Sequence, residues 1–183
     1  MLRRPALTLA LLLTSPLLIA LSVGGCAGAT ERPDGGVGLL SVGAEAPSLE
    51  ATAHDGTALN LRSLGKPALV YFYPADDTPG CTKEACAFRD IWTDYEAAGV
   101  LVIGVSTQDN ASHKAFAAKH ELPFPLVADT DEAWAKAFGV AVSGGYAKRV
   151  SFLLDGAGKI AQVYPGVDPG IHAREVLDAA AKL

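Results

Sequence analysis

Two cysteines on one short segment are the side chains of this sequence best suited to chemistry. Cys81 and Cys86 follow a long apolar run, and Thr78 and Pro79 come just before the first of them. Thr is a favourable N-cap residue and Pro suits the first helical position, so a helix is predicted to begin here. Cys81 then lies in the first helical turn, where free N–H groups and the helix dipole stabilise a thiolate. Gly80 leaves room for a small substrate at the sulfur.

The five-residue spacing limits what the two cysteines do together. In an intact helix, positions i and i+5 have Cα atoms about 8–9 Å apart, beyond the roughly 7 Å limit for a disulfide. The pair bridges only if the first turn unwinds, which favours a disulfide formed during a reaction over a permanent one. Oxidation in an exported compartment stays open. The spacing does not fit a C-x-x-C pair, and a zinc site lacks further thiols and suitably spaced histidines, so no metal is expected.

The cysteine segment joins two elements of an expected α/β domain. Residues 68–73 and 100–105 are continuous apolar runs, typical of strands buried on both faces of a largely parallel sheet. Helical periodicity over 82–98, ended by Gly99, makes a strand-helix-strand unit with a right-handed crossover. The remaining pattern predicts a mixed sheet flanked by helices on both faces, with further helices over 112–120, 131–138 and 171–183 and hairpins over 48–61 and 150–164.

Other polar and aromatic residues are given structural interpretations. Asp129 with Glu132 three residues later is typical of a capping box that begins the helix over 131–138. The histidines are scattered, so all four are interpreted as surface or capping residues: His54, His113, His120 and His172. Large aromatic residues on apolar faces are assigned to the core: Tyr71, Tyr73, Trp92 and Trp134.

The beginning of the chain has the composition of a targeting segment. Arg3 and Arg4 precede an uncharged stretch over 6–23 dominated by Leu and Ala, and the sequence Gly-Gly-Cys follows, ending at Cys26. This pattern is typical of a secretory signal, and the junction resembles a bacterial lipobox, in which the cysteine is lipidated. An uncleaved membrane anchor is the alternative, because the apolar stretch lies at the lower length limit for a span.

These patterns divide the chain into three parts. Residues 1–25 are predicted to be a lipoprotein signal peptide, and 26–43 to be the lipidated Cys26 with a flexible tether rich in Gly and Pro. Residues 44–183 form one domain, long enough to bury a substantial core. The expected product is an exported bacterial lipoprotein, anchored in a membrane and facing the periplasm or the cell exterior.

Charge and composition exclude other classes of function. The net charge is −5, and the signal segment contributes two positive charges, so the domain itself is more acidic still. An acidic domain poor in Lys and Arg is not expected to bind nucleic acid. Three cysteines are too few for a small domain held together by disulfides.

The cysteine segment resembles the active site of the peroxiredoxin family. Pro74-x-x-x-Thr78-x-x-Cys81 matches the family signature, and residues 78–86 look like the subgroup of bacterioferritin comigratory protein, or peroxiredoxin Q. The resemblance implies a thioredoxin-like fold and a peroxidase without a cofactor that reduces hydrogen peroxide and organic hydroperoxides. It extends over 42–183 and includes the blocks 104–106, 124–129 and 149–153.

The resemblance also implies a role for each matching residue. Cys81 would attack the O–O bond and become a sulfenic acid. Thr78 would hydrogen-bond the thiolate and the peroxide, and Pro74 would shield the sulfur from water. Arg149, just before an expected strand, would stabilise the thiolate and the charge that develops on oxygen. The backbone N–H groups of Gly80 and Cys81 would assist.

Two further residues are assigned by the same resemblance. Cys86 matches the resolving cysteine, which would condense with the Cys81 sulfenic acid, after which a thioredoxin-like or other dithiol would reduce the disulfide. If Cys86 is inert, an outside thiol must regenerate the enzyme directly. Glu84 either orients Arg149 or is a solvated acid of the helix. Members of the subgroup are often monomers, so a monomer is expected.

Two other functions fit a thioredoxin-like domain with two cysteines. A membrane-tethered thiol-disulfide oxidoreductase would exchange disulfides with proteins, although the C-x-x-C spacing is missing. A copper-binding assembly factor would use the two thiols and a distant histidine, although the residues before Cys81 do not suggest it.

Overall fold

The structure is a computed structural model that describes residues 29–183. The predicted signal peptide and Cys26 lie outside these residues. The central sheet contains β3 (Ala68–Phe72), β4 (Leu101–Ser106), β5 (Leu126–Ala128), β8 (Val150–Leu154) and β9 (Ile160–Tyr164). Its strand order is β5-β4-β3-β8-β9. The first three strands in sequence are parallel, whereas β8 runs antiparallel to β3 and to β9, so the predicted mixed sheet is confirmed.

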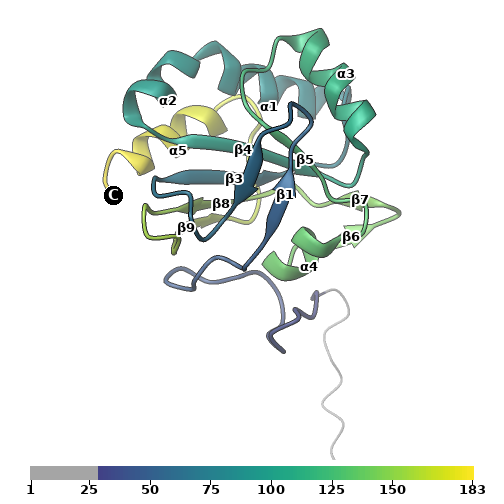
Figure 1. Cartoon of the computed structure of the whole chain (residues 1–183), viewed down its shortest axis with the longest axis vertical. Helices are drawn as coiled ribbons and strands as arrows, with labels where there is room; N and C mark the ends of the chain where they lie inside the picture. Colours follow the sequence, from purple (N-terminus) through teal and green to yellow (C-terminus); the bar gives the residue numbers. More distant parts are fainter. Residues whose placement is uncertain (1–28) are drawn as a thin grey trace, which may run out of the picture.

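Helices cover both faces of this sheet, as Figure 1 shows. They are α1 (Pro79–Asp90), α2 (Trp92–Ala98), α3 (Asn110–His120), α4 (Ala133–Phe138) and α5 (His172–Ala180). Alternate residues of β3 point to opposite faces. Tyr71 packs on Phe88 of α1, in a core that also receives α2, α3 and α5. Phe72 packs on Phe138 of α4, in a second core closed by the hairpin of β1 (Glu50–Thr52) and β2 (Ala58–Asn60).

The single helix expected over 82–98 is divided into α1 and α2. Ile91, with φ −118° and ψ 27°, ends the first helix and begins the second. The break lets Tyr95 of α2 face α5, where its hydroxyl donates to Ala173 O at 2.6 Å. Gly99 ends α2 in the left-handed conformation, as predicted.

The capping box expected before α4 is not formed. Glu132 is itself the N-cap residue, with φ 61°, and its side chain makes no capping hydrogen bond. Asp129 caps the helix from further upstream, since its carboxylate accepts from the N–H groups of Trp134 and Ala135, both at 2.8 Å. A small hairpin of β6 (Val142–Ser143) and β7 (Tyr146–Ala147), which the sequence pattern did not predict, follows α4.

Part of the segment expected to be a flexible tether is folded onto the domain. Leu40 is buried in the second core, and its N–H donates to Phe138 O at 3.0 Å. Gly43 donates to Ile160 O at 2.8 Å, beside the start of β9. The expectation of a free tether to residue 43 is therefore wrong, because one apolar side chain in a Gly- and Pro-rich segment contributes to the core. None of the helices within residues 29–183 is both long and apolar enough to cross a membrane.

Candidate active site

The reactive residues meet where β3 ends and β8 begins. Cys81 lies in the first turn of α1, directly after the loop that leaves β3. Arg149 precedes Val150, which pairs with Phe72 at the end of β3. This antiparallel pairing brings two residues that are 68 positions apart in sequence into contact, and Arg149 Nη2 donates to Cys81 Sγ at 3.2 Å. The structure thus places a cation directly on the sulfur.

The sulfur is enclosed on several sides. Cys81 is 1% exposed. A Cβ atom at Gly80 would lie 3.3 Å from Arg149 Nη2, closer than most such contacts, so glycine allows the guanidinium to approach the sulfur.

Glu84 binds the guanidinium of Arg149. Its side chain is fully buried, and Oε2 accepts a hydrogen bond from Arg149 Nη1. Burial raises the pKa of Glu84 to about 7, against the opposing effect of the Arg149 charge. Burial also disfavours the charged form of Arg149, but Glu84 and Cys81 outweigh this effect and raise its pKa. Of the two interpretations of Glu84, the structure shows the residue that orients Arg149 and not the solvated acid.

The loop before Cys81 carries the other two signature residues. Pro74 follows β3 and is half-buried. Thr78 is the N-cap residue of α1, as expected, but its hydroxyl donates to Ala75 O at 3.0 Å and makes no capping hydrogen bond. Its predicted hydrogen bond to the sulfur is not among the contacts of the structure. The loop conformation accounts for this, because the Thr78 hydroxyl already donates its hydrogen bond to the Ala75 carbonyl. The Thr78 oxygen can then only accept a hydrogen bond.

Both cysteines of the described residues are free thiols. Cys86 is half-buried and lies on the same helix as Cys81, and that helix is continuous from Pro79 to Asp90. A disulfide between them requires the first turn to unwind, since the pair is five residues apart.

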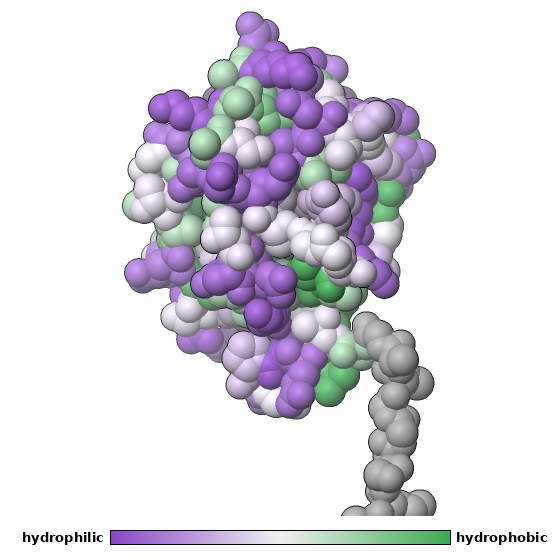
Figure 2. Space-filling view, turned by 90° about the vertical axis from the view of Figure 1, so that its right-hand side faces the viewer, coloured by the Kyte–Doolittle hydropathy of each residue, from purple (hydrophilic) through white to green (hydrophobic). Residues whose placement is uncertain are grey.

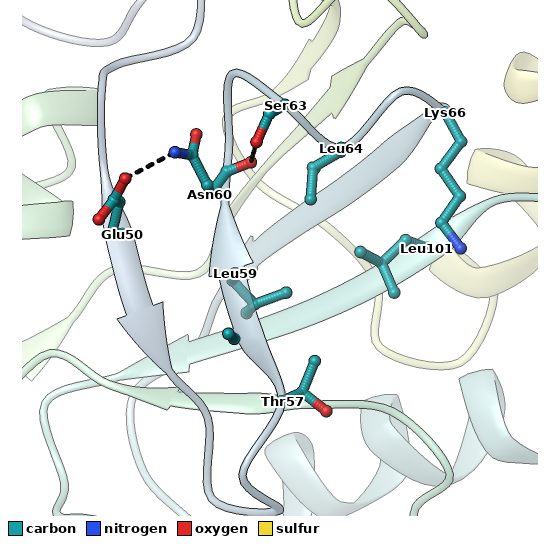
Figure 3. A pocket seen from close by; sticks show the side chains of 9 residues that line it. Glu50, Thr57, Leu59, Asn60, Ser63, Leu64, Lys66 and Leu101 are labelled. Atoms are coloured by element: carbon teal, nitrogen blue, oxygen red, sulfur yellow. Dashed lines mark hydrogen bonds between the residues drawn. The ribbon is translucent and has the colours of Figure 1, made fainter.

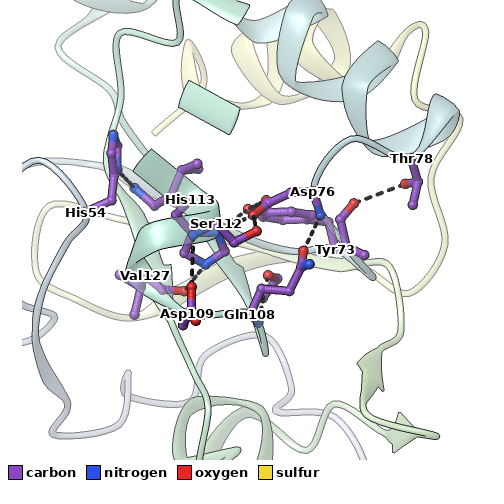
Figure 4. Close-up of polar contacts among 12 residues, drawn as sticks. His54, Tyr73, Asp76, Thr78, Gln108, Asp109, Ser112, His113 and Val127 are labelled. Carbon is purple, nitrogen blue, oxygen red and sulfur yellow. Dashed lines mark hydrogen bonds and ion pairs between the residues drawn. The ribbon is translucent and has the colours of Figure 1, made fainter. Parts of the chain in front are cut away.

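A buried polar network beside this loop was missed from the sequence (Figure 4). Asp76 accepts hydrogen bonds from Tyr73, Ser112 and His113. Burial opposes the charge of this carboxylate, but the hydrogen bonds from His113 and Ser112 outweigh it and hold the pKa of Asp76 below its usual range. A signal for the network existed, because Asp76 follows β3 and Ser112 follows β4, and the carboxyl ends of neighbouring parallel strands meet at one edge of a sheet.

Two of the four histidines contradict the prediction that all four are surface or capping residues. His113 and His172 are fully buried. His172 Nε2 shares a hydrogen bond with Ser151 Oγ at 2.9 Å, and its ring packs against Tyr164 and Phe88. Burial, with a smaller effect of Arg149, lowers the pKa of His172 to about 4. The ring is therefore neutral at neutral pH.

Burial of His172 predicts a loss of stability in acid. The unfolded state binds a proton near pH 6.5, whereas the folded state binds it near pH 4, so stability falls as the pH drops between these values. The total loss is about 3 kcal/mol. Between pH 7 and pH 5 the part of this loss that is due to His172 is about 2 kcal/mol. Denaturant unfolding of the reduced protein and of His172→Gln at both pH values measures it as the difference between their pH dependences, because Glu84, with its pKa raised to about 7, contributes the same opposite change to both. An unchanged pH difference in that variant would contradict the prediction.

A large surface pocket lies away from the sulfur (Figure 3). It has a volume of about 520 Å³ and is lined by residues that include Glu50, Asn60, Lys66 and Leu101. Lys66 and Leu101 stand at the amino ends of β3 and β4, whereas Cys81 follows the carboxyl end of β3. This pocket is therefore separate from the cysteine site. Within residues 29–183, no three His, Cys, Asp or Glu side chains are grouped so that they could hold a metal ion.

Comparison with known proteins agrees with this geometry. The model of the AhpC/TSA family matches residues 42–163. A Coxiella burnetii protein named peroxiredoxin bcp is 40% identical over 146 residues, which are 75% of this chain and 97% of that protein. The chloroplastic peroxiredoxin Q of Triticum aestivum is 43% identical and covers 76% of this chain, which spans 66% of that protein.

A solved structure shows the same likeness in three dimensions. The bacterioferritin comigratory protein of Xanthomonas campestris, described for its alkyl peroxide reduction activity, superposes with a TM-score of 0.71 at 34% identity. The match covers 78% of this chain and 98% of that one, and it confirms the thioredoxin-like fold. The chain belongs to the AhpC/TSA family and, within it, to the thiol-dependent peroxidases of the peroxiredoxin Q and bacterioferritin comigratory protein type.

Proposed function

We propose that Cys81 is the peroxidatic cysteine of this thiol-dependent peroxidase. The observation that carries the proposal is the hydrogen bond from Arg149 to a buried sulfur in a first helical turn. The thiolate attacks one peroxide oxygen, so that an S–O bond forms while the O–O bond breaks. The departing oxygen takes a proton and leaves as water or an alcohol, and Cys81 becomes a sulfenic acid. The guanidinium offsets the charge on sulfur and on the departing oxygen.

Cys86 is proposed to be the resolving cysteine. Its thiolate attacks the sulfenic sulfur, forming the S–S bond, and the hydroxyl of the sulfenic acid leaves as water after taking a proton. An external dithiol, for which a thioredoxin-like protein is our candidate, then reduces the disulfide by two electrons. The position of Cys86 supports this assignment, since both cysteines lie on the same helix, and unwinding of its first turn would bring their sulfurs within reach of each other. A monomer is proposed on family resemblance, and sedimentation of the purified protein tests it.

The order of these steps is tested by measuring the intact mass of the reduced protein after one equivalent of hydrogen peroxide is added. The parent protein is expected to lose two hydrogens within seconds. In Cys86→Ser the reaction is expected to stop after the first step, so the chain gains one oxygen that dimedone traps. If Cys86→Ser also loses two hydrogens, Cys86 is not the group that condenses with the sulfenic acid; if the parent stays reduced, the assignment of Cys81 is wrong. The rival functions, protein disulfide exchange and copper binding, find no support among the relatives.

A membrane anchor at Cys26, with 1–25 as a signal peptide, is proposed from the sequence. The described chain starts on the α4 side of the sheet, because Ala29 lines a pocket of about 190 Å³ together with Lys148 and Val150, and Val150 packs in the core that contains Phe138, whereas Cys81 packs in the core on the α1 side. Figure 2 shows the side of the molecule toward which the β6–β7 hairpin projects in Figure 1. On this side, polar groups surround a smaller apolar patch. A lipid at Cys26 would hold the domain close to a bilayer that faces the periplasm or cell exterior.

Tethering of the domain to a membrane favours lipid hydroperoxides as substrates. We expect the lipidated protein to reduce phosphatidylcholine hydroperoxide in vesicles at least about tenfold faster than a chain that begins at Ala27, because the anchor raises the local concentration of substrate. Hydrogen peroxide serves as the control substrate, and its rate is expected to be equal for both. Equal rates on the vesicles would remove the argument for a lipid substrate.

A further inference from the structure

We propose that Asp76 is a positioning residue that fixes the active-site loop to α3, so that α1 opens only between Asp77 and Arg89 during disulfide formation. The proposal rests on the function proposed above, in which the first turn of α1 unwinds. It concerns which part of the chain moves and which part is held while Cys81 reaches Cys86.

The carboxylate of Asp76 is held on both oxygens. Oδ1 accepts from the Tyr73 hydroxyl at 2.8 Å, while Oδ2 accepts from the Ser112 hydroxyl at 2.6 Å and from His113 Nδ1 at 2.9 Å. The backbone N–H of Asp76 donates to the side-chain oxygen of Gln108. Three of these four contacts come from the end of β4 and from α3, as Figure 4 shows. Asp76 therefore joins the loop before Cys81 to a different helix.

The contact with His113 is buried. His113 is fully buried, and its Nε2 lies 3.2 Å from the carbonyl oxygen of Val127, while Nδ1 lies against Asp76. The hydrogen bonds from His113 and Ser112 hold the pKa of Asp76 below its usual range, so the carboxylate is ionised at neutral pH. Because the Asp76 side chain is 4% exposed, separating it from these donors would leave a buried charge without its hydrogen bonds. The loop is thus strongly held at this point.

The other end of α3 holds the next residue of the loop. Asp77 has φ 56°, and its Oδ1 accepts from Lys119 Nζ and His120 Nε2, both at 2.9 Å. The carbonyl of His120 in turn accepts from Arg89 Nη1 at 2.8 Å, near the end of α1. One helix therefore holds the chain on both sides of residues 78–88. This span contains both cysteines, so the contacts define the piece that is free to unwind.

The arrangement has opposite consequences for the two chemical steps. With the loop held, Cys81 stays beside Arg149 in the reduced state, which favours attack on peroxide. The same contacts oppose unwinding, which the disulfide step needs. Asp76→Asn keeps the size of the side chain but removes its charge, so it should slow sulfenic acid formation and accelerate disulfide formation. A loss of general stability alone predicts no such division between the steps.

The test follows both steps by stopped flow, using the reduced full-length chain in detergent and hydrogen peroxide. Asp76→Asn is expected to lower the rate of the first step about tenfold and to raise the rate of the second. Asp129→Asn is the matched control, because it also neutralises a buried carboxylate with two hydrogen bonds, but at α4. It is expected to leave both rates near those of the parent. Ser112→Ala keeps the contact between Asp76 and His113, and it is expected to shift the two rates in the same directions as Asp76→Asn, by less.

The outcomes separate this proposal from the one on which it rests. If the parent fails to react with peroxide, the proposed function is wrong. If the parent reacts and Asp76→Asn either has parental rates or loses both rates, the positioning role is wrong. If Asp76→Asn does not fold, parental rates in Ser112→Ala overturn the proposal, and an opposite shift of its two rates supports it.

Discussion

Cys81→Ser is expected to lose peroxide consumption, by at least about 10⁴-fold, the scale on which removal of a nucleophile lowers catalysis. A serine hydroxyl is not ionised near neutral pH, so no anion remains beside Arg149 to attack the O–O bond. The buried site accepts the smaller oxygen, and the fold is expected to persist, as far-UV circular dichroism would show. The measurement is the rate of peroxide loss with dithiothreitol as reductant.

Cys86→Ser provides the comparison for this variant. It keeps Cys81 and Arg149 and is expected to react with the first equivalent of peroxide at the parental rate. If Cys86→Ser loses the first turnover and Cys81→Ser retains it, the two cysteines have the opposite roles. If both variants keep full activity, the chemistry lies outside the α1 site altogether.

Arg149→Met is expected to lower the second-order rate constant for hydrogen peroxide by about 10²–10³-fold, the usual effect of removing one donor to a developing charge. Methionine retains much of the apolar volume but neither donates to Cys81 Sγ nor pairs with Glu84. Without the guanidinium, the pKa of Glu84 should rise further above about 7, because the Arg149 charge is the influence that lowers it. Glu84 would then be neutral at pH 7, so the variant does not leave a buried anion beside the thiol.

Lys148→Met is the matched control for the guanidinium. Lys148 is the exposed neighbour of Arg149 and contributes a similar charge without a hydrogen bond to the sulfur. It is expected to keep the rate constant within about twofold, since exposed charges are screened by water and salt. Equal losses in the two variants would mean that general positive potential, and not the directed donor, supports the reaction.

The sequence predicted those parts of the structure that leave a local pattern. Buried strands are apolar throughout, so 68–73 and 100–105 were recognisable as β3 and β4. The start of α1 was also predictable, because Thr78 and Pro79 have strong positional preferences at helix ends. Arg149 was associated with Cys81 only by family resemblance, and the structure brings the two together through strand pairing.

What was missed depends on contacts between distant residues. His113 is one polar residue on a helix of low amphipathicity, and its partner Asp76 is 37 positions away, so no periodicity marks it as buried. Glu84 has the same appearance as a surface acid until Arg149 is placed over it. Leu40 was hidden in the same way, because the core it joins is assembled from α4 and the β-hairpin elsewhere in the chain.

The packing of residues 31–43 on the domain shortens the linker between the domain and the proposed membrane anchor. Glu31 pairs with Val37, and Leu40 is in the core, so five residues along the chain separate Cys26 from the folded part of the domain at Glu31. Their stretched length is about 17 Å. A domain of this size has a radius of gyration of about 15 Å. Anchored at Cys26 as proposed, the domain would stay in contact with the lipid headgroups. It would encounter substrates at the bilayer surface and few from the solution beyond it.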